Sequence, residues 1–215
     1  MRIEMDEETL EELKRIFSRV EGRAKLFFFK DASGECEYCK DLERILEKLA
    51  SLHDGLELAV LSSESEEAEK YEIPMFPAIL IHGAEEFNVR FFGAPIGYEF
   101  AVLIEDLVDA LRGRPELSRE VAERVEEIDK RVWIRVFVTP SCPYCPIAVR
   151  TAHKFAMLNK NIVADAIDAT EFRELAEKYG VFAVPKVVIN DRVEFEGAVP
   201  DRYFLSRILE AVQGD

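Results

Sequence analysis

The sequence predicts an α/β protein built from two tandem copies of one unit, each a mixed central sheet flanked by helices. Three landmarks recur in the same order along the 215 residues. Cys-x-x-Cys occurs at Cys36 and, 106 residues later, at Cys142. A tyrosine followed six residues on by proline ends at Pro77 and, 108 residues later, at Pro185. Phe-x-Gly-Ala occurs at residues 91–94 and again 104 residues later. Recurrence at nearly constant spacing indicates a duplicated unit.

The first unit begins with an acidic amphipathic helix, because Leu10, Leu13, Ile16, Phe17 and Val20 recur at helical spacing. A short apolar run typical of a buried strand follows it. From there we expect strand 24–29, helix 36–52 starting at the cysteines, strand 56–61, helix 65–71, a hairpin of two short strands after the proline, and helix 98–111.

The second unit repeats this order. We expect strand 132–138, helix 142–158, strand 162–167, helix 171–179, a hairpin after the second proline, and helix 201–212. Strand–helix–strand followed by an antiparallel hairpin predicts a mixed sheet with helices on both faces. Gly113 and Pro115 separate two helices, so we divide the chain into residues 1–113 and residues 114–215.

The composition is that of a packed, acidic protein. Hydrophobic residues make up 48% of the chain and its formal net charge is −15. The acidity argues against nucleic-acid binding, since phosphate contacts need clustered Lys and Arg. The N-terminal residues lack the apolar stretch of a signal peptide, and no apolar run approaches the roughly 20 residues of a spanning helix. We therefore expect a cytoplasmic protein with no membrane partner. Only one Gln and four Asn occur beside abundant Glu, Lys and Arg, which hints at a thermophilic source.

The cysteine spacing indicates redox chemistry. Cysteines at i and i+3 on the first turn of a helix face the same side, close enough to form a disulfide. The first lies where unpaired backbone N–H groups and the helix dipole favour an anion, so it is the better thiolate nucleophile. The second can attack the resulting mixed disulfide and release the partner. We assign Cys36 and Cys142 as attacking sulfurs and Cys39 and Cys145 as resolving sulfurs.

Each motif is followed about 40 residues later by a proline that directly precedes a strand. For one copy taken alone, a proline at the first position of a strand explains the placement equally well. A cis bond at Pro77 or Pro185 would instead place the backbone of Phe76 or Val184 beside the cysteines. The matching placement in both copies favours this second interpretation, in which these residues support the substrate.

The motifs resemble the thioredoxin superfamily, and Cys142-Pro-Tyr-Cys145 is the glutaredoxin form of the motif. Two such units in one acidic chain resemble the glutaredoxin-like protein disulfide oxidoreductases of hyperthermophilic archaea and bacteria. Residues 136–149 carry the clearest likeness and residues 184–190 support it. The resemblance implies an enzyme that reduces, oxidises and isomerises protein disulfides without a prosthetic group. It also implies a flavoprotein of the thioredoxin reductase type as electron donor.

The sequence departs from that pattern in two respects. Cys36-Glu-Tyr-Cys39 lacks the motif proline and follows a longer loop. Thioredoxin carries a buried acid six residues before its first cysteine, where this chain has Lys30 and Val136. A proton-shuttling carboxylate is therefore not expected at that position.

The charge is divided unevenly between the units. Residues 1–113 carry 13 Lys+Arg and 26 Asp+Glu, whereas residues 114–215 carry 15 and 17. Glu35, Glu37 and Asp41 lie near the first motif with only Lys40 against them, whereas residues 141–149 are uncharged. Carboxylates disfavour a nearby thiolate, so we predict that the second site is the more reactive and more oxidising. If the acids point to solvent, screening erases this difference.

Other functions stay open at this stage. One is a dedicated electron carrier for a single reductive enzyme. Another is a metal-binding Cys₄ protein or an iron–sulfur protein, although 102 residues separate the two cysteine pairs and zinc ribbons use roughly 15–20. His53, His82 and His153 share no metal-ligand spacing, so we predict no metal site. Tyr38 and Tyr144, inside the motifs, either pack beside the sulfurs or contact substrate.

Overall fold

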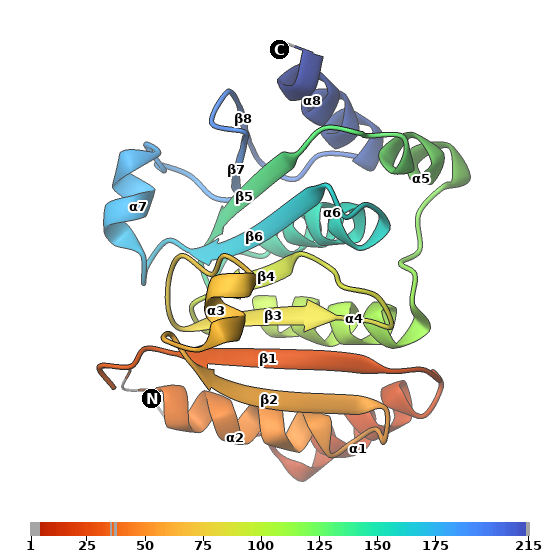
Figure 1. Cartoon of the computed structure of the whole chain (residues 1–215), viewed down its shortest axis with the longest axis vertical. Helices are drawn as coiled ribbons and strands as arrows, with labels where there is room; N and C mark the ends of the chain where they lie inside the picture. Colours follow the sequence, from red (N-terminus) through yellow and green to blue (C-terminus); the bar gives the residue numbers. More distant parts are fainter. Residues whose placement is uncertain (1–4, 35, 37, 214–215) are drawn as a thin grey trace.

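The structure is a computed structural model that describes residues 5–34, 36 and 38–213. Within these residues, eight strands form one mixed sheet in the order β2-β1-β3-β4-β6-β5-β7-β8 (Figure 1). The first half of the chain contains α1 (Glu7–Phe17), β1 (Ala24–Lys30), α2 (Cys39–Ala50), β2 (Leu56–Ser62), α3 (Glu66–Lys70), β3 (Ala78–His82), β4 (Val89–Phe92) and α4 (Glu99–Arg112). The second half contains α5 (Arg119–Glu126), β5 (Val132–Val138), α6 (Cys145–Leu158), β6 (Ile162–Asp168), α7 (Arg173–Lys178), β7 (Lys186–Ile189), β8 (Val193–Glu196) and α8 (Asp201–Gln213).

The two halves have the same strand pairing. β1 pairs parallel with β2 and antiparallel with β3, which continues antiparallel to β4. β5 likewise pairs parallel with β6 and antiparallel with β7, which continues antiparallel to β8. The turn after each hairpin also matches, because the Gly93 N–H donates to Pro77 O at 3.0 Å and the Gly197 N–H to Pro185 O at 2.8 Å. The predicted α/β class and mixed sheets are confirmed.

The two sheets join edge to edge. β4 and β6 pair in parallel, with Val89 opposite Ala164 and Phe92 opposite Ile167. Each strand would otherwise form an edge with unpaired N–H and C=O groups, which the junction satisfies. Every residue of β6 is buried as a result. The sequence pattern does not predict this junction, because an edge strand that pairs with another unit carries no distinguishing local signal.

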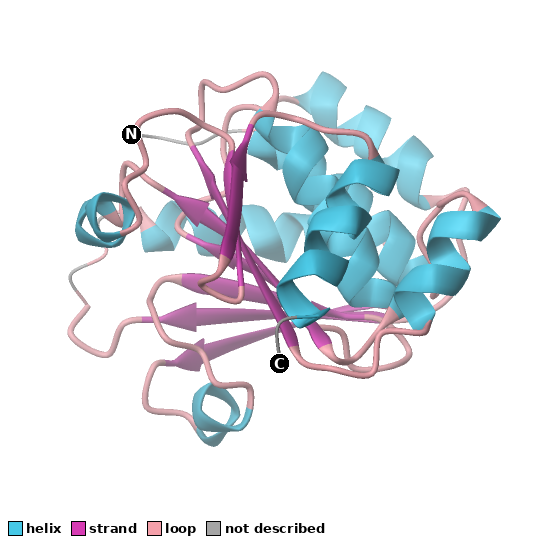
Figure 2. Ribbon diagram, turned by 90° about the horizontal axis from the view of Figure 1, so that it is seen from above, coloured by secondary structure: helices cyan, strands magenta, loops and turns pink. Residues whose placement is uncertain are grey.

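Helices cover both faces of the sheet, as predicted, but unequally (Figure 2). The larger core packs α1, α2, α4, α5, α6 and α8 against one face. The short helices α3 and α7 pack on the other face through Ala68 and Ala176, against Phe27, Phe92 and Phe137 of the strands. No helix in the described part of the chain is long and apolar enough to cross a membrane.

The helices after the cysteine motifs begin later than predicted. α2 starts at Cys39 and α6 at Cys145, so Cys36 and Cys142 lie in the preceding turn. In the second motif the Cys145 N–H donates to Cys142 Sγ at 3.1 Å, as a capping side chain would accept from the helix start. Pro146 occupies the first turn of α6.

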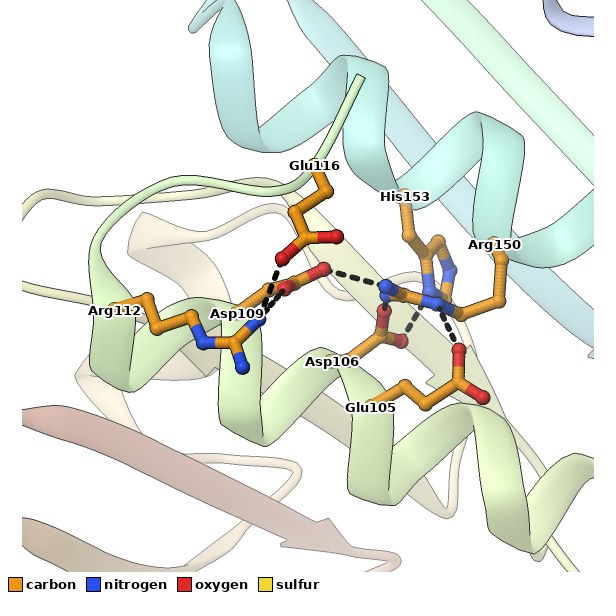
Figure 3. Close-up of polar contacts among 7 residues, drawn as sticks. All are labelled: Glu105, Asp106, Asp109, Arg112, Glu116, Arg150 and His153. Carbon is orange, nitrogen blue, oxygen red and sulfur yellow. Dashed lines mark hydrogen bonds and ion pairs between the residues drawn. The ribbon is translucent and has the colours of Figure 1, made fainter. Parts of the chain in front are cut away.

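A buried charged cluster joins α4 to α6 (Figure 3). The Arg150 guanidinium donates to Glu105 Oε2 at 2.9 Å and also to Asp106 and Asp109. His153 Nδ1 lies 2.6 Å from Asp106 Oδ2, and both side chains are fully buried. Because each acid has a cationic or imidazole partner, the cluster fixes how α4 lies on α6 and hence how the halves meet.

Candidate active sites

Each cysteine motif forms a disulfide. Cys36 is bonded to Cys39 and Cys142 to Cys145, with Cα–Cα distances of 5.4 and 5.5 Å. The turns that carry them follow β1 and β5. These strands point the same way, since two antiparallel steps lead from β1 to β4 and two parallel steps from β4 to β5. Both disulfides therefore follow the carboxyl ends of strands that point the same way, and these strands lie four spacings, or roughly 19 Å, apart along the sheet.

The second disulfide lies against the predicted proline loop. The Val184–Pro185 peptide bond is cis, and Cys142 Sγ lies 3.7 Å from Val184 O. The Cys142 N–H donates to Thr139 O at 3.1 Å, which closes the turn after β5. Cys142 is 7% exposed and Cys145 is fully buried. The N–H that points at Cys142 Sγ can stabilise a thiolate on that sulfur when the disulfide is reduced.

The first disulfide has a similar framework. The Phe76–Pro77 bond is also cis, and Cys39 is buried. Cys36 is only partly buried, so it is more accessible than Cys142. Glu35 and Glu37 lie outside the described residues. Asp41 pairs with Arg44 at 3.2 Å, so the predicted charge contrast between the sites is partly neutralised here and stays a prediction.

The two motif tyrosines differ. Tyr144 is 65% exposed. Tyr38 is partly buried, and its hydroxyl donates a hydrogen bond to Glu171 of the second half. Burial and the Glu171 carboxylate raise the pKa of the Tyr38 hydroxyl. Matching positions in the sequence therefore have different environments.

Comparisons with known proteins agree with this geometry. A thioredoxin domain family model matches residues 132–210. A protein disulfide oxidoreductase from Aeropyrum pernix superposes with a TM-score of 0.89 at 29% identity, covering 99% of this chain and 95% of that one. This chain has a thioredoxin fold and carries two CxxC disulfides. The N-terminal domain of the alkyl hydroperoxide reductase AhpF from Enterococcus faecalis shares the fold, with a TM-score of 0.86 and 23% identity over 95% of this chain and 100% of that one.

Curated relatives of this chain are longer proteins. The alkyl hydroperoxide reductase AhpF of Staphylococcus aureus is 24% identical over 92% of this chain and 36% of its own length. A Bacillus subtilis protein named NADH dehydrogenase is 27% identical over 75% of this chain and 30% of its own length. The chain thus spans about a third of the curated relatives it matches.

Sequence reasoning missed a buried acid beside the segment that leads to Cys142. Glu99, in the first turn of α4, is 3% exposed, and neither carboxyl oxygen has a hydrogen-bond partner among the described residues. It lines a cavity of about 10 Å³, shared with Asp168 and with Pro140, two residues before Cys142. Burial, with smaller contributions from Asp106 and Asp168, raises the pKa of Glu99 to about 8, which favours the neutral carboxyl at pH 7. Lys30 and Val136, the positions compared with thioredoxin, supply no acid. Nothing local marks Glu99, because it belongs to the first half and only the fold brings it beside residues of the second half.

The disulfides are too far apart to share a metal. A Cys₄ zinc site requires four sulfurs within about 2.3 Å of one ion, whereas roughly 19 Å of sheet separates the two pairs. Across the described part of the chain, no three His, Cys, Asp or Glu side chains are grouped to hold a metal ion. His53 contacts Val20 O, and His82 accepts from the Phe87 N–H.

Proposed function

We propose that the protein is a thiol–disulfide oxidoreductase that exchanges disulfides with protein substrates, reducing, oxidising and rearranging them. Cys36–Cys39 and Cys142–Cys145 are the two catalytic pairs, in units formed by residues 1–113 and 114–215. The observation that carries the proposal is the second site, where a helix-start N–H and the backbone before a cis-proline converge on Cys142 Sγ.

In the reducing direction, the Cys142 thiolate attacks a substrate disulfide. A mixed disulfide forms, and the first substrate sulfur leaves as a thiolate that takes a proton from solvent. Cys145 then loses its proton and attacks Cys142 Sγ, releasing the second substrate thiolate. Two electrons have moved to the substrate, and the Cys142–Cys145 disulfide remains. Oxidation of a substrate dithiol is the same sequence in reverse.

The cis-proline loops offer the substrate a backbone edge. We assign Phe76 with Pro77, and Val184 with Pro185, to substrate support at the first and second site. The second site is also surrounded by large apolar side chains that face solvent. Tyr144 lies inside the motif, Ile147 follows Cys145 by two residues, and Phe182, which is 95% exposed, precedes Val184 by two. Tyr98 belongs to this group because its N–H donates to Pro140 O. Exposed apolar surface around a disulfide favours polypeptide substrates with apolar residues next to their cysteines.

A second candidate is an electron carrier for one reductive enzyme. The similarity to part of the alkyl hydroperoxide reductase AhpF favours it. In either case the protein needs a reductant to restore its dithiols, and we propose a flavoprotein of the thioredoxin reductase type. Action in the cytoplasm stays a prediction from the sequence.

Two assays separate these functions. Reduction of insulin by the dithiol form tests general disulfide reduction, and reactivation of a scrambled-disulfide protein tests isomerisation. We expect the parent protein to be active in both assays. The C142S/C145S variant should lose more of this activity than the C36S/C39S variant. Inactivity in both, together with rapid electron delivery to a peroxidase, would replace the main proposal with the carrier.

A further inference from the structure

Tyr38 and Tyr144 occupy matching positions inside the two cysteine motifs, so their environments can be compared directly. Tyr144 is exposed, whereas the Tyr38 hydroxyl donates to Glu171 Oε2. Glu171 lies between β6 and α7, so a carboxylate of the second half contacts the residue between Cys36 and Cys39. The junction of β4 with β6 makes this contact possible, because the parallel pairing places the carboxyl ends of these two strands next to each other.

Glu171 is fixed by a second contact with the first half. Its Oε1 accepts from the Ala94 N–H at 2.9 Å. The preceding residue, Gly93, has φ +92°, and a Cβ there would lie 2.8 Å from Glu171 Oε1. A glycine is therefore suited to this position both by its backbone conformation and by the space that the carboxylate occupies. The two oxygens of one side chain thus hold two segments of the first half.

The charged surroundings of Glu171 are mixed. Asp168 at the end of β6 repels it, while Arg173, Glu174 and Lys178 line the same groove of about 650 Å³, which Met75 of the first half closes. Partial burial raises the pKa of Glu171, and the hydrogen bonds from Tyr38 and Ala94 oppose that rise.

We propose that Glu171 is a positioning residue for the first catalytic pair, acting through Tyr38. The inference rests on the proposed function of Cys36–Cys39 and adds that this site depends on the second half. The contact is present with Cys36 and Cys39 joined as a disulfide, and a carboxylate held beside the motif disfavours a thiolate there, so we expect Glu171 to favour the oxidised form. Its loss makes that disulfide easier to reduce.

The test measures each pair alone. In a C142S/C145S background, the equilibrium between the first disulfide plus two glutathione molecules and the dithiol plus glutathione disulfide is measured for the parent, E171Q and Y38F. We expect both substitutions to shift it toward the dithiol by about threefold to tenfold, the range of one hydrogen bond. E171Q, which removes a charge, also lowers the pH at which Cys36 ionises, read from thiolate absorbance. Y38F, which keeps the carboxylate, leaves that pH in place or raises it.

The matched control is Y144F in a C36S/C39S background, which should change the second equilibrium less than twofold. Thermal denaturation confirms that each variant is folded. An unchanged first equilibrium in folded E171Q and Y38F overturns the inference. Equal shifts in both pairs also overturn it, because they indicate a global effect. Failure of the parent protein to reduce insulin would instead reject the proposed function, and these equilibria would still be measurable.

Discussion

Arg90 and Asp165 form a buried two-bond salt bridge across the junction of the halves. Arg90 Nε lies 2.7 Å from Asp165 Oδ1, and the second guanidinium nitrogen lies 3.0 Å from Oδ2. The Trp133 indole N–H also donates to Asp165 at 2.6 Å. Because the residues lie opposite each other on β4 and β6, the pair holds the register of the joined sheet.

Asp165→Asn should therefore be strongly destabilising. It leaves the Arg90 charge buried without a counterion, which costs about 3–5 kcal/mol. Glu72→Gln is the matched control, since Glu72 also pairs across the halves with Arg131 but on the surface, where such pairs contribute about 0–1 kcal/mol. Urea denaturation of both variants measures the difference. Similar losses for the two would show that the buried pair does not hold the junction.

Glu99 should make stability depend on pH. The folded pKa of about 8 exceeds the ordinary 4.5, so the folded state holds a proton that the unfolded chain releases between these values. Stability is therefore retained below about pH 4.5 and falls as the pH rises to about 8. E99Q removes this pH-dependent loss of stability. Relative to the parent, it should raise the free energy of unfolding by at most about 5 kcal/mol at pH 9 and change it little at pH 4. Guanidinium midpoints at both pH values measure it, and a pH-independent effect of E99Q would contradict the assignment.

Ionised Glu99 should also slow the second site. Above pH 8 its carboxylate repels a Cys142 thiolate, so alkylation of Cys142 should rise less steeply with pH in the parent than in E99Q. The C36S/C39S background isolates this reaction. If the alkylation rates of the parent and of E99Q rise in parallel with pH, Glu99 does not influence the reactivity of Cys142.

Phe182 should matter for protein substrates and not for small ones. Phe182→Ala removes an exposed ring beside the Val184 loop, so KM for insulin should rise about threefold to tenfold, equivalent to losing about 1 kcal/mol of apolar contact. Reduction of a small aromatic disulfide is the control and should be unchanged. Equal losses for both substrates would indicate a disturbed Cys142 turn instead.

The sequence hypothesis about the two sulfurs can be measured directly. In separate Cys36→Ser and Cys142→Ser variants, we expect the remaining attacking cysteine to be alkylated faster when it is Cys142. The N–H at Cys142 Sγ supports this order, whereas the greater exposure of Cys36 opposes it. Faster alkylation of Cys36 would reject the hypothesis.

The repeat makes the fold and the cysteine pairs predictable, because Cys36 and Cys142 carry the same local pattern before the same kind of helix. Both prolines are likewise recognisable from their spacing. Glu99 and Glu171 are not, since each acts on the opposite half and only tertiary packing brings it there. Both α2 and α6 start three residues after their predicted positions, because the first cysteine of each motif precedes the regular helix and the second begins it.

The continuous sheet sets a fixed spacing for substrates. The strands that precede its two disulfides lie about 19 Å apart along the sheet, and an extended polypeptide covers about 3.3 Å per residue. We therefore expect a substrate segment with two cysteines about six residues apart to span the distance between these two strands. Cysteines adjacent in a substrate sequence can meet only one, and this spacing gives the molecule a geometric basis for distinguishing between the two kinds of segment.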